Sequence, residues 1–220
     1  MLLKHAGYEA DYPSQQTCCG QMHYNAGRVE QAAKLAQRFC HVFEPYDVVV
    51  CPSGSCTSMV RFHYPDMVSS SSVPQRVFEL CEFLWERAFD VDFSPRLHGR
   101  AAVHVGCHSR RMIDNTRAVN HWLSTVRGLT IVPTESDSWC CGFGGTFSVK
   151  YPRISTAIGN RKIDNLAASH VDYLIFTDSS CAMHLQGLIS RRGWDGPVGL
   201  HMAEVLASSL LESRGMQAHG

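Results

Sequence analysis

A Cys-Cys-Gly tripeptide occurs twice in this chain, at Cys18–Gly20 and again at Cys140–Gly142. Each copy is followed by an apolar, strand-like run that ends at one further cysteine. The run Asp47–Cys56 aligns without a gap to the run Asp172–Cys181. The second cysteine of the pair and the later cysteine are 37 residues apart in the first copy and 40 in the second. This pattern predicts two related halves, each with cysteines at the spacing of a metal or cluster site.

The segments between these motifs alternate between strand-like and helix-like patterns. Strands are expected at 47–51, 101–105, 129–132 and 172–176, helices at 25–43, 54–62, 77–89, 116–126, 152–168 and 181–190, and a last strand and helix within 198–211. Such alternation is typical of α/β folds with a mostly parallel sheet. We therefore predict two pseudo-repeated halves, residues 1–95 and 96–220, each a small mostly parallel sheet with flanking helices. Residues 90–100 are expected to form the linker between them.

Composition excludes several classes of protein. Basic and acidic residues number 20 each, so no net charge favours binding to nucleic acid or to an anionic membrane. The apolar runs are too short to span a bilayer, and the N-terminus has no apolar signal core, so we expect a cytoplasmic protein without a transmembrane segment. Ten cysteines would suggest disulfides in a small secreted protein, but four of them are sequence neighbours, which rarely bond to each other. Metal ligation or redox chemistry is the better interpretation.

The first half is expected to lack its opening strand. In the second half Cys107 follows a strand and lies 33 residues before the cysteine pair. The same distance before Cys18 falls ahead of Met1. Either the natural chain starts earlier or the first half has lost a ligand, and we favour the earlier start because removing a strand would expose a sheet edge.

The four cysteines of the second half are expected to meet. Loops at the carboxyl ends of parallel strands converge on one crevice, which would gather Cys107, Cys140, Cys141 and Cys181. Four thiolates suit either tetrahedral zinc or an iron–sulfur cluster. The adjacent pair favours a cluster, because each of the two sulfurs can then bind its own iron.

Glycines follow the second cysteine pair, at Gly142, Gly144 and Gly145. They would let backbone N–H groups approach the sulfurs of a bound cofactor, which tunes its reduction potential. A tight loop needs glycine for its geometry as well, and both roles can hold together. The segment Gly142–Phe147 fails the dinucleotide-binding fingerprint at its last glycine, and no phosphate-loop lysine motif occurs, so no nucleotide cofactor is expected.

The first half offers three candidate ligands, Cys18, Cys19 and Cys56. Three thiolates could hold an incomplete cluster or a zinc ion, or nothing at all. Cys51 aligns with Phe176 in a strand and is predicted to be a core residue, as buried cysteine usually is.

His108 is the candidate catalytic residue because it stands beside Cys107. It could donate a hydrogen bond to a cluster or assist proton transfer. Alternatively, His108 is a loop residue with no functional role.

The chain resembles the cysteine-rich CCG-domain iron–sulfur proteins, and within them the lactate-utilization protein A group. Relatives of that group are the iron–sulfur subunit of glycolate oxidase and the CCG-containing subunit of heterodisulfide reductase. The resemblance spans nearly the whole chain and is carried by Gln16–Gln21, Pro52–Val60, Cys107-His108, Cys140–Pro152 and His201–Leu206.

The resemblance implies an electron-transfer subunit that works with other subunits of a complex oxidising L-lactate to pyruvate. Heterodisulfide reductases carry a Cys-x-x-Cys at the end of each repeat, whereas this chain has Ser53 and Asp178 at the earlier positions. Four ligands and an ordinary 4Fe-4S cluster are therefore expected in the second half. Two alternatives stay open: thiol–disulfide reduction at the cluster, and a zinc-stabilised assembly scaffold without redox turnover.

Overall fold

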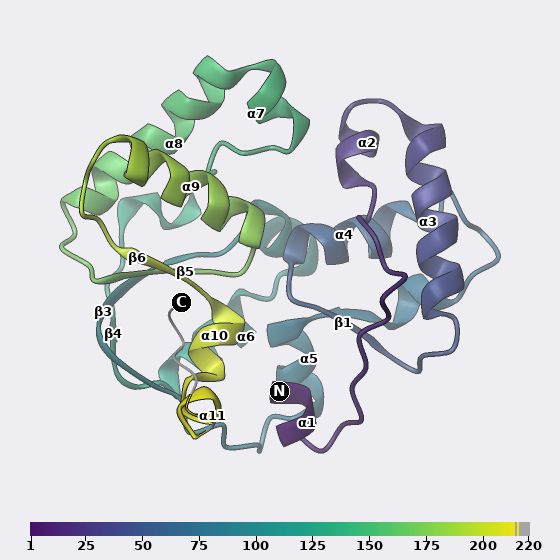
Figure 1. Cartoon of the computed structure of the whole chain (residues 1–220), viewed down its shortest axis with the longest axis horizontal. Helices are drawn as coiled ribbons and strands as arrows, with labels where there is room; N and C mark the ends of the chain where they lie inside the picture. The colour runs from purple at the N-terminus through teal and green to yellow at the C-terminus, as the bar shows by residue number, and fades with distance from the viewer. Residues whose placement is uncertain (214, 216–220) are drawn as a thin grey trace.

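The computed structural model describes residues 1–213 and residue 215 of the 220-residue chain (Figure 1). The elements in chain order are α1 (Leu2–His5), α2 (Gln21–Asn25), α3 (Val29–Phe43), β1 (Val49–Cys51), α4 (Gly54–His63), η1 (Val73–Arg76), β2 (Val77–Glu79), α5 (Leu80–Arg87), β3 (Arg96–His104), η2 (Ser109–Ile113), α6 (Thr116–Ser124), β4 (Arg127–Ile131), η3 (Glu135–Ser138), α7 (Thr146–Lys150), α8 (Pro152–Ala167), β5 (Tyr173–Phe176), α9 (Ser179–Arg191), β6 (Val198–His201), α10 (Met202–Leu206) and α11 (Ser208–Glu212). Among the described residues no helix is both long enough and apolar enough to cross a membrane.

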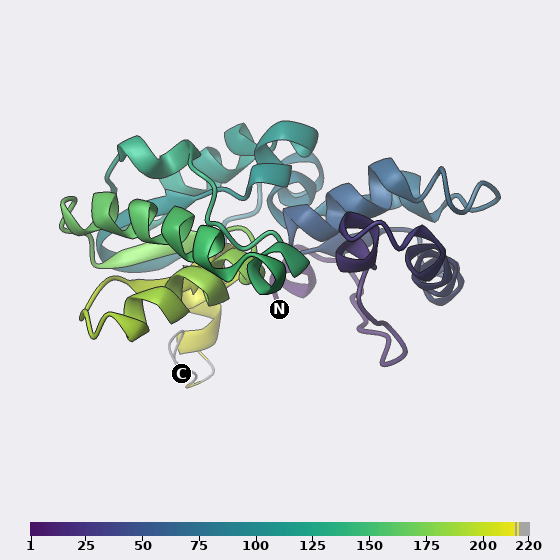
Figure 2. The same ribbon diagram turned by 90° about the horizontal axis from the view of Figure 1, so that it is seen from above.

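Two parallel sheets form the framework, which confirms the predicted two-halved α/β fold. Strands β1 and β2 pair in the first half, with Val49 opposite Val77. The second sheet has the strand order β4-β3-β5-β6, and every pair in it is parallel. In Figure 1, α2 and α3 lie on one side of the molecule and α8 and α9 on the other, with α4 between them. Figure 2 shows the same division from above, with the purple helices of the first half to the right and the green and yellow segments of the second half to the left.

The central strand β5 is buried on both faces of the four-stranded sheet, and its side chains alternate between those faces. On β5, Ile175 packs into the apolar cluster formed with α5, α6 and α10. Its neighbours Leu174 and Phe176 pack into the opposite cluster, under α8 and α9. Cys141 and Cys181 belong to that second cluster. The sheet therefore fixes on which face these two cysteines lie.

Helix α5 joins the two halves through a shared core. It precedes residue 95, yet Leu80, Phe83 and Leu84 pack in the same buried cluster as the second sheet. The indole N–H of Trp122 on α6 donates a hydrogen bond to the carbonyl oxygen of Cys81 at 3.2 Å. The division of the chain near residue 95 stays a prediction, and the two halves are not separated by solvent at this helix.

Three sequence-based element predictions were wrong in part. The helix predicted over 77–89 begins only at Leu80, because residues 77–79 form β2 and pair with β1. The linker predicted over 90–100 already contains the first residues of β3, which pair with β4. The helix predicted over 25–43 begins only at Val29, because Gly27, whose φ of +76° lies in the left-handed region, separates α3 from the short helix α2 before it.

The structure extends the repeat beyond the cysteine motifs. Strand β2 runs directly into α5, as β6 runs directly into α10. Both helices begin with a capping box, Glu79 with Glu82 in the first half and His201 with Glu204 in the second. The segments 77–84 and 199–206 are therefore equivalent parts of the two halves.

Candidate metal centre

The structure brings the four predicted cysteines of the second half together. Cys107 follows β3, Cys140 and Cys141 follow η3, and Cys181 lies in the first turn of α9 after β5. Their thiols neighbour one another in series: Cys107 lies beside Cys140, Cys140 beside Cys141, and Cys141 Sγ donates to Cys181 Sγ at 3.1 Å. Cys141 and Cys181 are buried, whereas Cys107 is half-buried and Cys140 is exposed. The group therefore has a dry inner side and an open outer side.

Backbone amides already point at two of these sulfurs. The N–H of Gly142 donates to Cys140 Sγ at 3.3 Å, and the N–H of Phe143 donates to Cys141 Sγ at 3.4 Å. Gly142 has a φ of +92°, and a Cβ added there would lie 2.4 Å from the carbonyl oxygen of Ser155 on α8. Only glycine fits this turn without a shift of the backbone.

Gly144 and Gly145 shape the next turn, with φ values of +57° and +62°. The amides of Gly142 and Phe143, rather than those of Gly144 and Gly145, donate to the cysteine sulfurs within the described residues of this half. A Cβ on Gly145 would lie 3.4 Å from Cγ of Met22 on α2, so this turn meets the first half of the chain.

The thiol contacts make the second-half group ready to lose a proton. The neighbouring thiols of Cys107 and Cys141 hold the pKa of Cys140 well below the usual range of a thiol. The same proximity raises the pKa of Cys107 and of Cys141, and burial raises both further. Thiolate is the form that binds metal, so one member of the group is poised for ligation and a bound cation would favour deprotonation of the rest.

The first half repeats the contacts of the second. Cys19 is buried, and its Sγ donates to Cys56 Sγ at 3.3 Å. The N–H of Gly20 donates to the sulfur of the exposed Cys18 at 3.4 Å, as Gly142 does to Cys140. The structure thus places Cys19 in contact with Cys56, whereas Cys18, the neighbour of Cys19 in sequence, is exposed.

Cys51 joins this first group, which sequence reasoning missed. It ends β1 and packs against the apolar cluster of the first half, as a core residue would. Its thiol donates to the carbonyl oxygen of Ser53 at 3.6 Å and lies beside Cys56, and the neighbouring thiols of Cys19 and Cys51 lower the pKa of Cys56 to about 3. The alignment with Phe176 favoured a core role alone. The position of Cys51 at the carboxyl end of a strand was a signal that it could also belong to the cysteine group.

His104 is the second residue that sequence reasoning missed. It ends β3, where the prediction treated it only as part of a strand. A ring nitrogen of His104 and the sulfurs of Cys141 and Cys181 all lie within 4.8 Å of one another, and all three residues are buried. Three donors at this spacing could hold a metal ion.

His108 lies between the two halves. Its Nδ1 is 3.5 Å from Cys107 Sγ, and its Nε2 is 3.4 Å from the side-chain nitrogen of Gln21 on α2. The same Gln21 nitrogen donates to the carbonyl oxygen of Ser55 at 3.0 Å. The imidazole therefore borders the second cysteine group. Through Gln21 it is also linked to the start of α4 in the first half.

The segments that carry Cys56 and Cys181 meet at the start of α4. The Asp178 carboxylate accepts hydrogen bonds from the hydroxyls of Ser53 at 2.8 Å and Ser55 at 2.7 Å, and from the N–H of Ser55 at 3.1 Å. Ser53 and Asp178 are 125 residues apart, which is the offset of the repeat. A Cβ on Gly54 would lie 1.6 Å from Oγ of Ser109, so the two halves are closely packed here.

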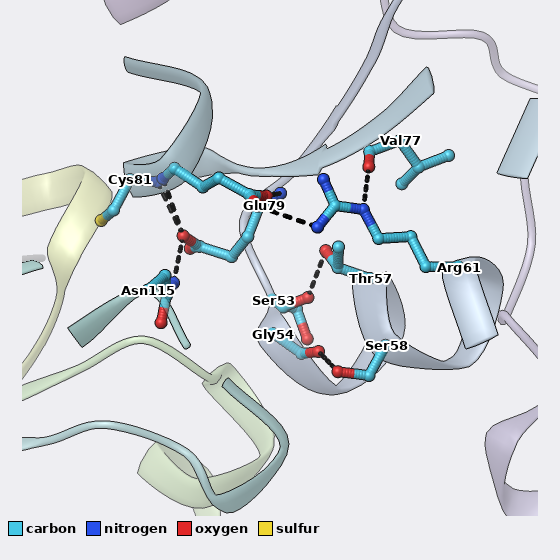
Figure 3. Close-up of polar contacts among 10 residues, drawn as sticks. Ser53, Gly54, Thr57, Ser58, Arg61, Val77, Glu79, Cys81 and Asn115 are labelled. Carbon is cyan, nitrogen blue, oxygen red and sulfur yellow. Dashed lines mark hydrogen bonds and ion pairs between the residues drawn. The ribbon is translucent and has the colours of Figure 1, made fainter. Parts of the chain in front are cut away.

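The first turn of α4 is held by its own side chains (Figure 3). The hydroxyls of Thr57 and Ser58 donate to the carbonyl oxygens of Ser53 and Gly54 at 2.9 and 2.7 Å. Cys56 lies in this same turn, so its position is fixed by a rigid element rather than a mobile loop.

The fold and the paired cysteine groups define a cysteine-rich α/β protein with two candidate metal sites. Residues 1–61 and 101–186 match the profile of the cysteine-rich domain, CCG, and the chain belongs to this family. It is similar to proteins named lactate utilization protein A. That of Macrococcus caseolyticus is 37% identical over 213 residues, covering 93% of this chain and 86% of the relative.

Two further relatives of that name show the same extent of similarity. The protein of Geobacillus kaustophilus is 38% identical over 213 residues, covering 93% of this chain and 88% of its own. The protein of Bacillus thuringiensis is 37% identical over 216 residues, covering 94% and 89%.

Proposed function

We propose that this chain is an iron–sulfur electron-transfer subunit of an oxidoreductase complex that converts L-lactate to pyruvate. The observation that carries the proposal is the group of four second-half thiols that neighbour one another in series, with two amide donors on its sulfurs. The name of the relatives supports lactate as the substrate of the complex. We place the protein in the cytoplasm.

The donor set fits a 4Fe-4S cluster held by Cys107, Cys140, Cys141 and Cys181. When bound, such a cluster supplies one-electron transfer at a potential set by its surroundings. The chain contributes four thiolates and the N–H groups of the Gly142 turn, and such hydrogen bonds favour the more negative, reduced state. The open side at Cys107 and Cys140 is where a redox partner would approach.

The first half is proposed to hold a second, less complete centre. Its donors are Cys18, Cys19 and Cys56, with Cys51 beside Cys56. This set suits an incomplete cluster or a zinc ion. The contact between the two halves at Asp178 puts both centres on one interface, which suits electron transfer between them.

The chemistry on lactate itself is assigned to companion subunits of the complex. Oxidation of a 2-hydroxy acid releases two electrons and two protons, and this chain would carry the electrons onward one at a time. We assign it no nucleotide cofactor, no nucleic acid and no transmembrane segment of its own. His108, beside Cys107, is kept as the candidate for assisting proton movement.

Two observations support rival functions. The spacing of His104, Cys141 and Cys181 suits a single zinc ion, as a scaffold without redox turnover would bind. The short sulfur–sulfur distances, 3.3 Å between Cys19 and Cys56 and 3.1 Å between Cys141 and Cys181, suit thiol–disulfide chemistry.

Anaerobic purification separates these functions. We expect the wild-type chain to be brown, to contain iron and acid-labile sulfide, and to show a paramagnetic signal on reduction. Cys181→Ala should lose at least half of the iron, whereas Cys40→Ala, a buried cysteine of α3 that packs in the apolar cluster of the first half and is no candidate ligand, should retain it. A colourless chain that contains zinc would contradict the proposal.

A second measurement addresses the substrate. The complete complex should reduce an artificial dye when L-lactate is added, and should fail to do so when this subunit is left out. Dye reduction that does not depend on this subunit would remove the assignment to lactate oxidation while leaving the metal site intact.

A further inference from the structure

His104 is a buried polar residue without a polar partner. Only 1% of its surface is exposed, and neither ring nitrogen has a hydrogen-bond partner within the described part of the chain. Its ring contacts that of Phe176, the residue opposite it on β5, with ring centroids 5.9 Å apart. Buried nitrogen atoms are nearly always hydrogen-bonded in proteins, so this exception requires an explanation.

Two cysteine sulfurs lie close to the ring nitrogens of His104. A nitrogen of His104 lies within 4.8 Å of Sγ of both Cys141 and Cys181, on the dry side of the second-half group. An imidazole ring carries at least one N–H donor in either protonation state, and a ligating thiolate sulfur is an acceptor.

We propose that His104 is part of the second-half metal centre and that its ring N–H donates a hydrogen bond to the sulfur of Cys141 or Cys181 when the centre is loaded. This inference rests on the proposed function. The hydrogen bond stabilises negative charge on the sulfur and so favours the reduced state of the centre. His104 is therefore a positioning and potential-setting residue, and the thiolates remain the ligands.

The arrangement favours a donor over a fifth ligand. The four thiols already neighbour one another in series without His104. His104 lies behind the two buried cysteines, whereas Cys107 and Cys140 face the open side. A hydrogen bond from this inner position also gives the orphaned ring nitrogen the partner that it lacks.

The test uses the full chain loaded anaerobically with ferrous iron and sulfide. His104→Leu removes the donor at similar volume, and His104→Gln restores an N–H donor. Phe176→Leu is the matched control, because it alters packing at the opposite residue without removing a donor. Each variant is measured for iron and sulfide content and for its reduction potential by a titration followed by EPR.

We expect His104→Leu to keep the iron of the wild type and to be about tenfold harder to reduce, which is about 59 mV for one electron. His104→Gln should recover at least half of that difference, and Phe176→Leu should retain the wild-type potential. In protein labelled with ¹⁵N-histidine, pulsed EPR should show a weak nitrogen coupling in the wild type that His104→Leu loses, which separates it from any coupling of His108 beside Cys107.

The possible failures are distinguishable. An unchanged potential in His104→Leu, or the absence of a nitrogen coupling, would overturn the role of His104 and leave the iron–sulfur function standing. Loss of iron from His104→Leu together with a strong nitrogen coupling in the wild type would make His104 a ligand, which also overturns the inference. A wild-type chain that takes up no cluster would overturn both proposals.

Discussion

Gly142 meets two physical demands at one position. Its φ of +92° lies where residues with a side chain are strained, and a Cβ would press against the carbonyl oxygen of Ser155. The same residue sends its N–H to Cys140. The geometry of the cysteine pair therefore depends on the absence of a side chain next to it.

Gly142→Ala is expected to lower the free energy of unfolding by about 2 kcal/mol or more, because a left-handed residue with a side chain costs about 1–2 kcal/mol before any steric overlap. The variant should also bind less iron, since the turn that carries Cys140 must shift. Urea unfolding of the metal-free chain and iron content measure the two effects.

Gly187→Ala is the control for this change. Gly187 lies in α9, and a Cβ there meets no atom within 4 Å. The variant should be more stable by about 0.5–1 kcal/mol, because alanine favours the helix. Equal effects of the two substitutions would contradict the role given to Gly142.

The cysteine groups could be predicted from the sequence because the repeat gives the spacing twice. Cys51 and His104 could not be assigned in the same way, since each lies in a strand and has no polar counterpart in the other half. Which face of a strand a side chain occupies at its last residue depends on the register of the sheet. Only the three-dimensional arrangement shows that these two residues border the cysteines.

At the scale of the element, the start of α5 links β2 to two other helices (Figure 3). The buried carboxylate of Glu79 accepts hydrogen bonds from the N–H groups of Cys81 and Glu82 at 2.8 and 3.3 Å, and from Asn115 at 2.6 Å. The Glu82 side chain accepts from the N–H of Glu79 and pairs with Arg61 of α4. One helix start therefore holds together parts of both halves.

This helix start predicts a pH dependence of stability. Burial raises the pKa of Glu79 from 4.5 to about 7, so the folded chain holds this proton more tightly than the unfolded chain. The contribution to stability is then complete below about pH 4.5 and is lost as the pH rises through about 7. Its size is about 3 kcal/mol on the basis of the pKa difference.

Glu79→Gln, which cannot lose a proton, should flatten the fall in unfolding free energy between about pH 5 and pH 8. Glu86→Gln, an exposed residue of the same helix, should leave the slope unchanged. Urea unfolding at several pH values measures both. A wild-type slope that persists in Glu79→Gln would show that another group is responsible.

The three residues before α5 also show what the sequence pattern alone could not predict. The segment 77–79 continues the apolar spacing of the helix, and nothing local distinguishes the two states. It becomes a strand because β1 offers a parallel partner, and Glu79 then caps the helix. Tertiary pairing decided between two local structures that the sequence allowed equally.

At the scale of the whole molecule, Asp178 ties the start of α9 to the start of α4. Its carboxylate is almost completely buried, and its hydrogen bonds from Ser53 and Ser55 cross between the halves. The repeat predicted two halves of one fold. It could not predict this contact or the core shared through α5, because repeats specify each half and not how the halves pack.

Asp178→Ala should lower the free energy of unfolding by about 2–3 kcal/mol, because it removes three hydrogen bonds to a carboxylate and leaves buried donors unpaired. Asp164→Ala removes the exposed ion pair with Arg192 and should cost less than about 1 kcal/mol. Hydrogen exchange should become faster at the amides of Ser55 and Cys56 in Asp178→Ala alone. Similar losses in both variants would mean that the contact between the halves adds no stability.

Ser53 and Asp178 occupy the same place in the two repeats and bind each other. In a symmetric dimer of identical chains, a residue on the twofold axis faces its own copy. Two buried aspartates so placed would repel, and two serines would give only a weak neutral contact. When both copies lie in one polypeptide, the two equivalent positions can hold different residues. Here Asp178 supplies the carboxylate that accepts the hydrogen bond, and Ser53 supplies the hydroxyl that donates it. The two cysteine groups can differ between the halves for the same reason.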